Sequence, residues 1–291
     1  MHIGFLGAGL LGRPMAERLK AAGHQVTVYN RTKEKVADLP KAGMAVAATP
    51  DEAIRAGDGV ILMLADAPAI RTLLFAPASK AAIKGRTVIQ MGTIGPGESR
   101  AIQKDVLAAG GDYFEAPVLG SIAEAKAQKL LVMVGGAEEQ FTNWVGLLKS
   151  FGPEPRLIGP VGKAAAIKLA LNQLIAAEIS AFSLSLGLVQ REDIPVETFM
   201  AILKQSALFA PAFEKKLPRL LARDYTNPNF STKNLLKDLN LFLDESKGLG
   251  LDPDCASGVR ALLQQAIDRG LADVDYSAVH SLVNPSNGNK G

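Results

Sequence analysis

Apolar and polar positions alternate in short blocks along the first half of the chain. Continuous apolar runs such as residues 59–64 are typical of strands that are buried on both faces of a sheet. The blocks predict strands at residues 2–6, 25–29, 44–47, 59–64, 87–90, 112–116, 130–134 and 155–157. The segments between them predict helices at residues 11–22, 32–41, 50–56, 68–74, 96–109, 123–127 and 137–150.

This alternation predicts an α/β fold with a doubly wound, mainly parallel sheet. After residue 162 the pattern changes to long helical segments with almost no strand signal. Helices are expected there at residues 163–192, 195–205, 211–222, 231–247 and 253–270. We therefore predict a sheet domain at residues 1–161 and an all-α domain at residues 162–291, with a disordered polar tail at residues 284–291.

The amino-acid composition and the net charge limit the class of protein and the kinds of partner that are expected. Of the 291 residues, 48% are hydrophobic and 21% are charged, as expected for a globular protein of one or two domains. The net charge of +3 comes from basic residues spread along the chain, so no nucleic-acid partner is expected. The most apolar later stretch, residues 164–189, contains Lys168, Asn172 and Glu178. These polar residues favour a buried helix over a membrane span.

Cysteine and histidine are scarce. The single cysteine, Cys255, excludes an internal disulfide, so we expect a reducing, cytoplasmic location and a small, partly buried side chain at this position. His2, His24 and His280 lie far apart in the sequence and have no ligand spacing, so no metal site is expected.

A glycine-rich loop follows the first expected strand and opens the first expected helix. In the Gly7-x-Gly9-x-x-Gly12 pattern, the first glycine makes a tight turn. The second lets a pyrophosphate approach the backbone, and the third lets the helix pack on the strand. This context predicts a Rossmann-type dinucleotide-binding domain, with the phosphates at the start of the helix. The expected cofactor contacts of this loop are Gly7, Ala8, Gly9, Leu10, Leu11 and Gly12.

The residues at the end of the second expected strand indicate which dinucleotide is bound. Asn30 stands where an NAD-binding chain carries an aspartate or glutamate for the ribose hydroxyls. Arg31 follows and offers a planar fork that suits a 2′-phosphate, and Thr32 adds a hydroxyl. We therefore predict NADP(H) as the cofactor, the alternative being that Arg31 is an exposed residue at a helix start.

Two polar residues lie within the apolar run AAAIKLALNQLIAA. Lys168 and Asn172 are four residues apart, so their side chains leave one face of a helix. A lysine in such surroundings is costly unless a site uses or pairs it. The pattern alone leaves two interpretations open, a catalytic pair or a pair whose lysine extends its ammonium to solvent.

These segments resemble the β-hydroxyacid dehydrogenase family, which includes 3-hydroxyisobutyrate dehydrogenases and glyoxylate/succinic semialdehyde reductases. The similarity covers nearly the whole chain in order. It comprises the glycine loop with residues 30–32, residues 63–66, residues 91–96, residues 115–121, and residues 159–162 leading into Lys168 and Asn172.

The resemblance implies a role for each site residue. It places the backbone of Leu64 and Ala65, the Thr93 side chain and Lys237 against the cofactor, and it makes Lys168 the catalytic acid. The substrate-binding residues that it implies are Leu119, Gly120, Ser121, Asn172, Phe230 and Asp238. The sequence alone favours an ordinary charged helix pair for Lys237 with Asp238, and an ordinary core residue for Phe230.

The sequence departs from the family pattern at three positions in or beside these segments. Leu119 stands where the family usually has a serine that helps to hold the substrate carboxylate. Gln90 and Gly92 stand where the family often has aspartate and serine. Either the amides of Gly120 and Ser121 hold the carboxylate without help, or the substrate is less polar at that end.

The implied chemistry is reduction of a carbonyl by NADPH. The Lys168 ammonium would polarise the carbonyl oxygen and protonate the developing alkoxide. In the reverse direction a neutral lysine would act as base, which favours high pH because lysine ordinarily titrates near pH 10.4. The expected substrates are small aldehyde or keto acids such as glyoxylate, succinic semialdehyde or tartronate semialdehyde. The family also implies a homodimer or homotetramer.

Three other functions remain open from the sequence. Oxidation of 3-hydroxyisobutyrate or a related 3-hydroxy acid uses the same fold, but the missing acid at Asn30 disfavours an NAD-linked reaction. Imine reductases and non-catalytic NADP(H)-binding modules are the other two. Because such relatives generally lack the catalytic lysine, Lys168 argues against both, although Leu119 keeps the binding module open.

Overall fold

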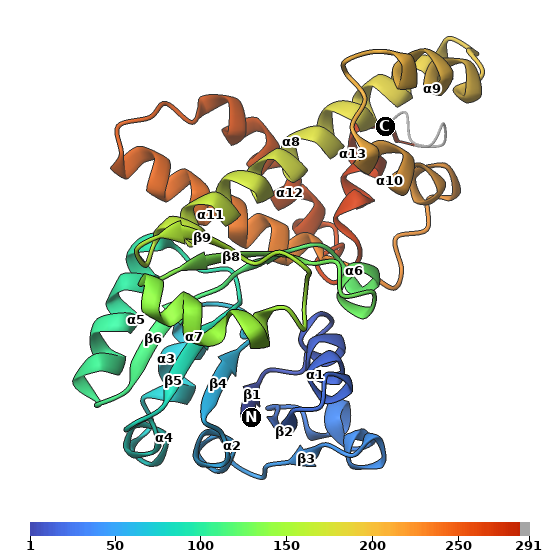
Figure 1. The fold of residues 1–291 in the computed structure, drawn as a ribbon. Helices are drawn as coiled ribbons and strands as arrows, with labels where there is room; N and C mark the ends of the chain where they lie inside the picture. Colours follow the sequence, from blue (N-terminus) through green and yellow to red (C-terminus); the bar gives the residue numbers. More distant parts are fainter. Residues whose placement is uncertain (286–291) are drawn as a thin grey trace. The chain divides into compact units, whose positions relative to one another are not determined.

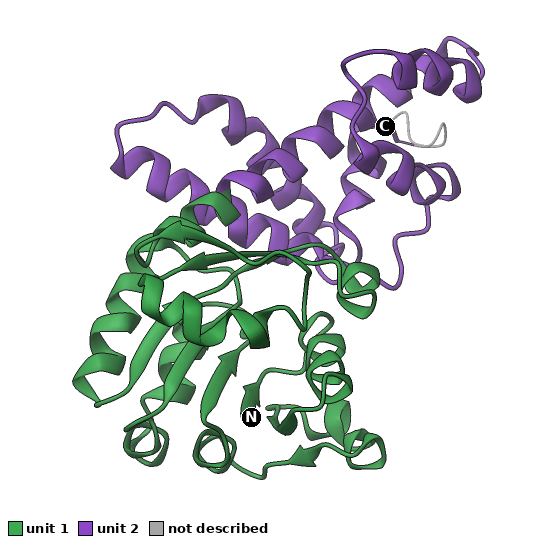
Figure 2. Cartoon of the chain, in the orientation of Figure 1, with its two compact units in different colours: residues 1–169 green, residues 170–291 purple. Residues whose placement is uncertain are grey.

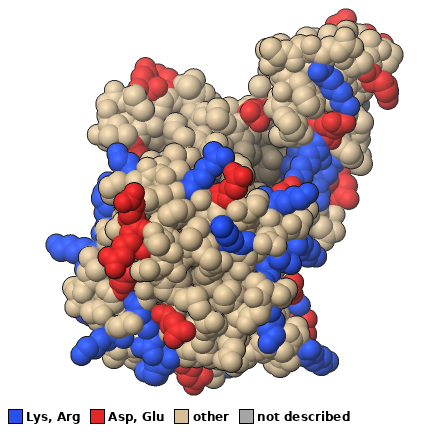
Figure 3. Space-filling view, viewed as in Figure 1, with Lys and Arg blue, Asp and Glu red and all other residues tan. Residues whose placement is uncertain are grey.

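The computed structural model describes residues 1–285 of the chain. It forms two compact units, Met1–Leu169 and Ala170–Gly291 (Figures 1 and 2). The division falls within the long helix α8 (Lys163–Arg191), whereas the sequence predicted a boundary ahead of this helix, between residues 161 and 162. On the face that Figure 3 shows, basic and acidic side chains are interspersed.

The first unit contains the predicted doubly wound sheet, with the strand order β3-β2-β1-β4-β5-β6-β8-β7 and with β9 paired to β8. Strands β1 to β6 pair in parallel, and β8 runs antiparallel to β6. The strands are β1 (His2–Leu6), β2 (Gln25–Tyr29), β3 (Ala45–Val46), β4 (Gly59–Leu62), β5 (Thr87–Gln90), β6 (Asp112–Glu115), β7 (Val118–Leu119), β8 (Leu131–Gly135) and β9 (Arg156–Gly159).

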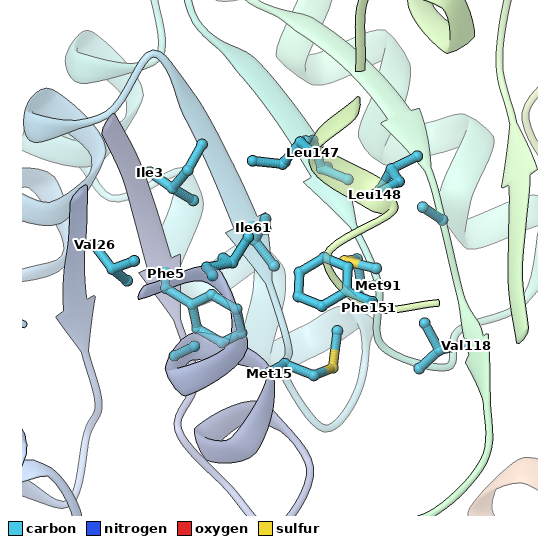
Figure 4. Close-up of a cluster of buried hydrophobic side chains, with 14 of the residues drawn as sticks. Ile3, Phe5, Met15, Val26, Ile61, Met91, Val118, Leu147, Leu148 and Phe151 are labelled. Atoms are coloured by element: carbon cyan, nitrogen blue, oxygen red, sulfur yellow. The ribbon is translucent and has the colours of Figure 1, made fainter. Parts of the chain in front are cut away.

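Two apolar layers hold helices against the two faces of this sheet. Successive residues of a strand point to opposite faces, so Phe5 belongs to one layer and Leu6 to the other. Figure 4 shows Phe5 and Ile61 of neighbouring strands beside Met15 of α1 and Phe151. The helices of this unit are α1 (Gly12–Ala21), α2 (Pro50–Ala56), α3 (Ala67–Leu74), α4 (Pro77–Ala82), α5 (Pro96–Ala108), α6 (Ile122–Lys126) and α7 (Glu138–Leu148).

The predicted helix at residues 32–41 is wrong. The structure has two 3₁₀ turns there, η1 (Lys33–Val36) and η2 (Leu39–Ala42). Pro40 lacks the amide hydrogen that a continuous helix requires. Only Val36 and Leu39 are buried within this segment, which gives a helix too narrow an apolar face. The prediction also missed α4 and the two-residue strand β7.

The second unit is helical, as predicted. Helix α8 supplies Ala176, Ile179, Phe182 and Leu186 to its apolar core. By length and mean hydropathy α8 also suits a membrane span, but these buried side chains make it a core helix of this unit. The remaining helices are α9 (Val196–Gln205), α10 (Pro211–Ala222), α11 (Thr232–Gly248), α12 (Asp254–Asp268), η3 (Tyr276–Val279) and α13 (His280–Val283), of which the last two were not predicted.

Two expectations about single residues in this unit are wrong. Cys255 is exposed rather than partly buried, because it lies in the first turn of α12 on the outward face. Asn284, which we placed in a disordered tail, is buried and hydrogen-bonded. Residues 286–291 of that expected tail lie outside the described residues.

A buried polar network fixes the end of α13. The Asn284 side chain donates to Gln190 Oε1 at 2.7 Å and accepts from the Arg191 guanidinium. This orientation directs the Asn284 NH₂ group toward His280 Nε2, 3.3 Å away, so Nε2 is the acceptor and the ring is neutral. Burial, together with the charges of Arg223 and Arg191, lowers the pKa of His280 to about 4.

His280 is expected to make stability pH-dependent. Because its folded-state pKa lies below that of an unfolded histidine, its contribution is complete above pH 6.5 and is lost as pH falls toward 4. The loss reaches about 3 kcal/mol at pH 4. Urea unfolding of wild type and His280→Leu between pH 4 and 7.5 measures it, with a flatter profile expected for the variant. Parallel profiles would contradict this assignment.

The second unit also contains a buried ion pair. Lys216 Nζ lies 2.7 Å and 2.8 Å from the two carboxylate oxygens of Asp275, which is fully buried. Ser277 donates to the same carboxylate through its amide and its hydroxyl. The Lys216 ammonium also lies 4.2 Å from the centre of the Tyr276 ring. This pair therefore joins α10 to the segment that begins η3.

Replacing Lys216 with methionine leaves the Asp275 carboxylate buried without its cation. We expect the free energy of unfolding to fall by about 3–5 kcal/mol, measured by chemical denaturation at pH 7. Lys204→Met is the matched control, because Lys204 forms an exposed pair with Glu214 at 2.6 Å. That control is expected to cost less than about 1 kcal/mol. Equal losses in the two variants would contradict the prediction.

Candidate functional site

The backbone around the loop after β1 gives a physical reason for two of its three glycines and leaves open space beside the third. Gly7 has a φ of +105°, and a Cβ there would lie 2.3 Å from the Met63 carbonyl oxygen. A Cβ on Gly12 would lie 2.0 Å from the Gly7 carbonyl oxygen. A Cβ on Gly9 would meet no protein atom within 4 Å. Turn and packing therefore require Gly7 and Gly12, whereas Gly9 leaves an open cradle at the start of α1 that fits a pyrophosphate.

Asn30 connects the end of β2 to this loop. Its Oδ1 accepts from the Ala8 amide at 3.0 Å, and its Nδ2 donates to the Thr32 carbonyl at 2.7 Å. The position that would bind ribose hydroxyls in an NAD-binding chain therefore holds a neutral amide. The sequence identified the missing acid but not this bond to the glycine loop.

Arg31 is an available cation beside Asn30. Its side chain is exposed, and no acidic partner contacts it within residues 1–285. Arg13 on α1 differs, because its guanidinium pairs with Asp38 at 2.6 Å and with Glu17 at 3.0 Å. The Arg31 guanidinium is therefore able to donate hydrogen bonds to a phosphate without breaking an existing ion pair.

The departures at Gln90 and Gly92 are linked physically. Gln90 is buried at the end of β5, and its Nε2 donates to the Gly92 carbonyl at 3.2 Å. A Cβ on Gly92 would lie 2.6 Å from the Leu64 carbonyl oxygen. The backbone after β4, at Leu64, therefore approaches the segment that carries Thr93 too closely for a serine at position 92.

In the loop after β7, the polar groups of Ser121 are bonded to the side-chain carboxylate of Glu124 in the helix that follows. The amide of Ser121 donates to Glu124 Oε2 at 2.7 Å, and the Ser121 hydroxyl donates to the same oxygen. Gly120 has a φ of +137°, which favours glycine. Leu119 is partly exposed and pairs with Leu131 of β8, so its side chain offers no donor. The Ser121 amide, which is one of the two predicted donors, and the Ser121 hydroxyl are therefore both already bonded to Glu124.

The structure brings three of the predicted residues together in the helical unit. Asn172 of α8 donates through Nδ2 to Asp238 Oδ2 of α11 at 2.6 Å. Lys237 Nζ lies 2.7 Å from the other carboxylate oxygen of Asp238. Asn172 and Asp238 are each 1% exposed, and Asn172 Oδ1 is buried with no hydrogen-bond partner in the described residues. Asn172 Oδ1 is therefore a buried acceptor that no described residue uses.

Lys168 lies one turn before Asn172 on α8 and is 9% exposed. Phe230 packs on the core of the helical unit with its ring edge-on to Tyr276, 5.9 Å between centres. An open cavity of about 840 Å³ in the first unit, beside Arg100 and Trp144, is lined by none of the predicted residues.

The sequence analysis missed Glu115. This carboxylate ends β6, is 1% exposed, and accepts from the amides of Gly162 at 2.8 Å and Ala165 at 3.0 Å. Burial raises the pKa of Glu115, although the Ser99 hydroxyl and the amides oppose this shift. The signal in the sequence is an acidic residue that follows the two apolar residues Tyr113 and Phe114 at the end of the strand.

Comparison with known proteins adds a family to this geometry. A model described as the NAD binding domain of 6-phosphogluconate dehydrogenase matches residues 2–159. A second, described as the NAD-binding domain of NADP-dependent 3-hydroxyisobutyrate dehydrogenase, matches residues 162–283.

Curated relatives align over almost the full chain. Glyoxylate/succinic semialdehyde reductase 1 of Arabidopsis thaliana is 30% identical over 96% of this chain and 97% of its own length. The 2-hydroxy-3-oxopropionate reductase of Escherichia coli is 32% identical over 96% of each chain. A crystal structure of 3-hydroxyisobutyrate dehydrogenase from Salmonella typhimurium has a TM-score of 0.88 at 24% identity, covering 97% of this chain and 99% of that one. This chain therefore belongs to the 3-hydroxyisobutyrate dehydrogenase-like branch of the β-hydroxyacid dehydrogenases, which are NAD(P)-dependent oxidoreductases acting on CH–OH groups.

Proposed function

We propose that this enzyme reduces small aldehyde or keto acids with NADPH, and that Lys168 donates the proton. Glyoxylate, succinic semialdehyde and tartronate semialdehyde are the proposed substrates. The observation that carries the proposal is a lysine held 9% exposed on α8, one turn before the buried Asn172. The names of the Arabidopsis and Escherichia coli relatives support the substrate class.

NADP(H) is proposed as the cofactor because the end of β2 favours a 2′-phosphate. Asn30 presents no carboxylate to repel that phosphate, and Arg31 has no competing acidic partner in the described part of the chain. The open face of Gly9 and the start of α1 accommodate the pyrophosphate. When bound, the cofactor supplies a hydride to the carbonyl carbon.

The side chains of α8 and α11 have separate parts in this proposal. The Lys168 ammonium hydrogen-bonds the carbonyl oxygen and gives it a proton as negative charge develops. Asp238 fixes the Asn172 amide so that Nδ2 faces the carboxylate and Oδ1 faces away from it. Asn172 Oδ1 is then free to accept a hydrogen bond from the bound ligand. Thr93 and Lys237 are proposed to contact the cofactor.

The loop at residues 119–121 is proposed to bind the substrate carboxylate. Since Glu124 already takes both Ser121 donors, that carboxylate has to bind through the Gly120 amide or displace the Glu124 side chain. Leu119 adds an apolar contact in place of a hydroxyl. This loop is therefore expected to discriminate among acids of different length. Phe230 is proposed as a further substrate contact.

Oxidation of a 3-hydroxy acid is the second candidate function. The match of residues 162–283 to the 3-hydroxyisobutyrate dehydrogenase model favours it. The same residues serve the reverse reaction, with a neutral Lys168 as base, so the two candidates differ in substrate and direction rather than in site.

We further propose a homodimer or homotetramer. Helix α8 exposes Leu184 and Leu188, which are 61% and 63% accessible and lie one turn apart. Exposed apolar rows of this kind mark protein interfaces. Light scattering coupled to size exclusion decides between these assemblies and a monomer.

Initial rates of the wild-type enzyme test the proposed function. Glyoxylate, succinic semialdehyde and tartronate semialdehyde are each offered with NADPH and with NADH, and 3-hydroxyisobutyrate with NADP⁺ and NAD⁺. Faster NADPH-linked reduction of at least one aldehyde acid supports the proposal. Turnover of 3-hydroxyisobutyrate alone selects the second candidate, and NADPH binding without any turnover contradicts both.

A further inference from the structure

The long helix that carries Lys168 begins without a capping side chain of its own. The residue before α8 is Gly162, and the first turn contains Lys163 but no acid. A helix start exposes amide hydrogens and a partial positive charge that need an acceptor. Serine, threonine, aspartate or asparagine normally provides it locally. In α8 the local sequence does not.

A distant carboxylate supplies the missing cap. Glu115 of β6 accepts from the amide of Gly162 at 2.8 Å and from that of Ala165 at 3.0 Å. The Ala164 amide contributes to the same interaction. Glu115 is 1% exposed, and a buried carboxylate is retained in a fold only with such compensation.

The second carboxylate oxygen is held as well. The Ser99 hydroxyl of α5 donates to Glu115 Oε2, and the Tyr113 hydroxyl lies 2.8 Å from Ser99 Oγ. Neither oxygen has a cationic partner among these contacts. Neutral donors therefore hold both oxygens of the Glu115 carboxylate. This arrangement favours a role in orienting the start of α8 over a role in neutralising a nearby cation.

Glycines on both sides make room for this arrangement. A Cβ on Gly135, which pairs with Glu115 across β6 and β8, would lie 2.5 Å from Glu115 Oε1. Gly162 has a φ of +100°, and a Cβ there would lie 2.3 Å from the Arg100 guanidinium. Gly135 thus leaves the space that the Glu115 carboxylate occupies, and the positive φ of Gly162 favours a glycine in the turn before α8.

We propose that Glu115 is a positioning residue, which fixes the first turn of α8 and thereby the direction of the Lys168 side chain. Ala165, which donates to Glu115, lies one turn before Lys168 on the same helix. A rotation or tilt of the first turn of α8 would therefore move the next turn, which carries Lys168. The consequence for catalysis rests on the proposed role of Lys168, whereas the cap itself does not.

Hydrogen exchange tests the cap independently of activity. The amides of Gly162, Ala164 and Ala165 are expected to exchange slowly in the wild-type protein, although first-turn amides are ordinarily unprotected. In Glu115→Met, which keeps the length of the side chain but has no acceptor oxygen, their exchange should rise at least roughly 10-fold. Glu115→Gln retains a carbonyl oxygen and should restore part of the protection.

Kinetics test the consequence for Lys168. Glu115→Met is expected to lower kcat roughly 10-fold to 100-fold, since a small misplacement of a catalytic group has that effect. The KM and Kd for NADPH should stay unchanged. Gly135→Ala should shift kcat and exchange in the same direction. Glu52→Met is the control. Glu52 of α2 accepts from the amide of Ala48, which precedes that helix, at 2.8 Å. We expect this variant to alter neither kcat nor the exchange of the α8 amides.

Several results would overturn the proposal. Fast wild-type exchange at Gly162, Ala164 and Ala165 excludes the cap, and so does unchanged exchange at these amides in Glu115→Met. Unchanged kcat in a Glu115→Met protein with lost protection excludes the positioning role. If wild type reduces no carbonyl, the proposed function fails, but the exchange data still decide whether Glu115 caps α8.

Discussion

Replacing Lys168 with alanine is expected to reduce kcat for aldehyde reduction by about 10²–10⁴-fold, the usual contribution of a positioned general acid. The Kd for NADPH, measured by quenching of cofactor fluorescence, should remain within about twofold of wild type. The reason is that Lys168 is proposed to act on the substrate oxygen and not on the cofactor. Because Lys168 is only 9% exposed, solvent water is expected to be a poor proton donor in its place in the alanine variant.

Two further variants sharpen this prediction. Lys168→Arg keeps a positive charge but cannot readily give up a proton, so it should be nearly as impaired as the alanine variant. Lys163→Ala removes an exposed lysine from the same helix and should leave kcat unchanged. Near-normal turnover in both Lys168 variants would show that another group donates the proton.

Replacing Arg31 with alanine is expected to raise the KM for NADPH about 10-fold to 100-fold, the loss typical of a charge-assisted hydrogen bond. The KM for NADH should change little, because NADH lacks the 2′-phosphate that Arg31 is proposed to bind. Initial rates with both cofactors at saturating aldehyde measure the two effects side by side.

Lys33→Ala is the control for Arg31. Lys33 is an exposed cation at the start of η1, two residues after Arg31, so its loss tests general electrostatic attraction alone. We expect that variant to raise the KM for NADPH less than about threefold. An equal rise for NADPH and NADH in Arg31→Ala would contradict recognition of the 2′-phosphate.

Features that depend on neighbouring residues were predictable from the sequence. The spacing of Gly7, Gly9 and Gly12 determines a turn, a cradle and a helix start within a few residues, and the structure has all three. The alternation of strands and helices was likewise sufficient for the fold class, because each apolar run lies in one element.

Features that depend on distant residues were not predictable in this way. The Asn30–Ala8 bond joins the end of β2 to the loop after β1, and the Glu115 bonds join β6 to α8. Asn284 looked like part of a polar tail because its partners, Gln190 and Arg191, lie on α8. In each case a polar side chain finds its partner only after the chain has folded.

The linked departures at Gln90 and Gly92 show the same limit. Each is unusual for the family when considered alone, and no neighbouring residue in the sequence explains either. In the structure the Gln90 amide donates to the Gly92 carbonyl, and the approach of the Leu64 carbonyl leaves no space for a Cβ at position 92.

We propose that this enzyme transfers a hydride from NADPH to the carbonyl carbon of a small aldehyde acid, and that Lys168 supplies the proton. Mass spectrometry of the product formed with NADPH deuterated at the transferred C4 position tests it most directly. We predict one deuterium on the carbinol carbon of glycolate or 4-hydroxybutyrate with wild type, and hardly any labelled product with Lys168→Ala in the same time. A product without deuterium, or equal labelling by both proteins, would contradict the account.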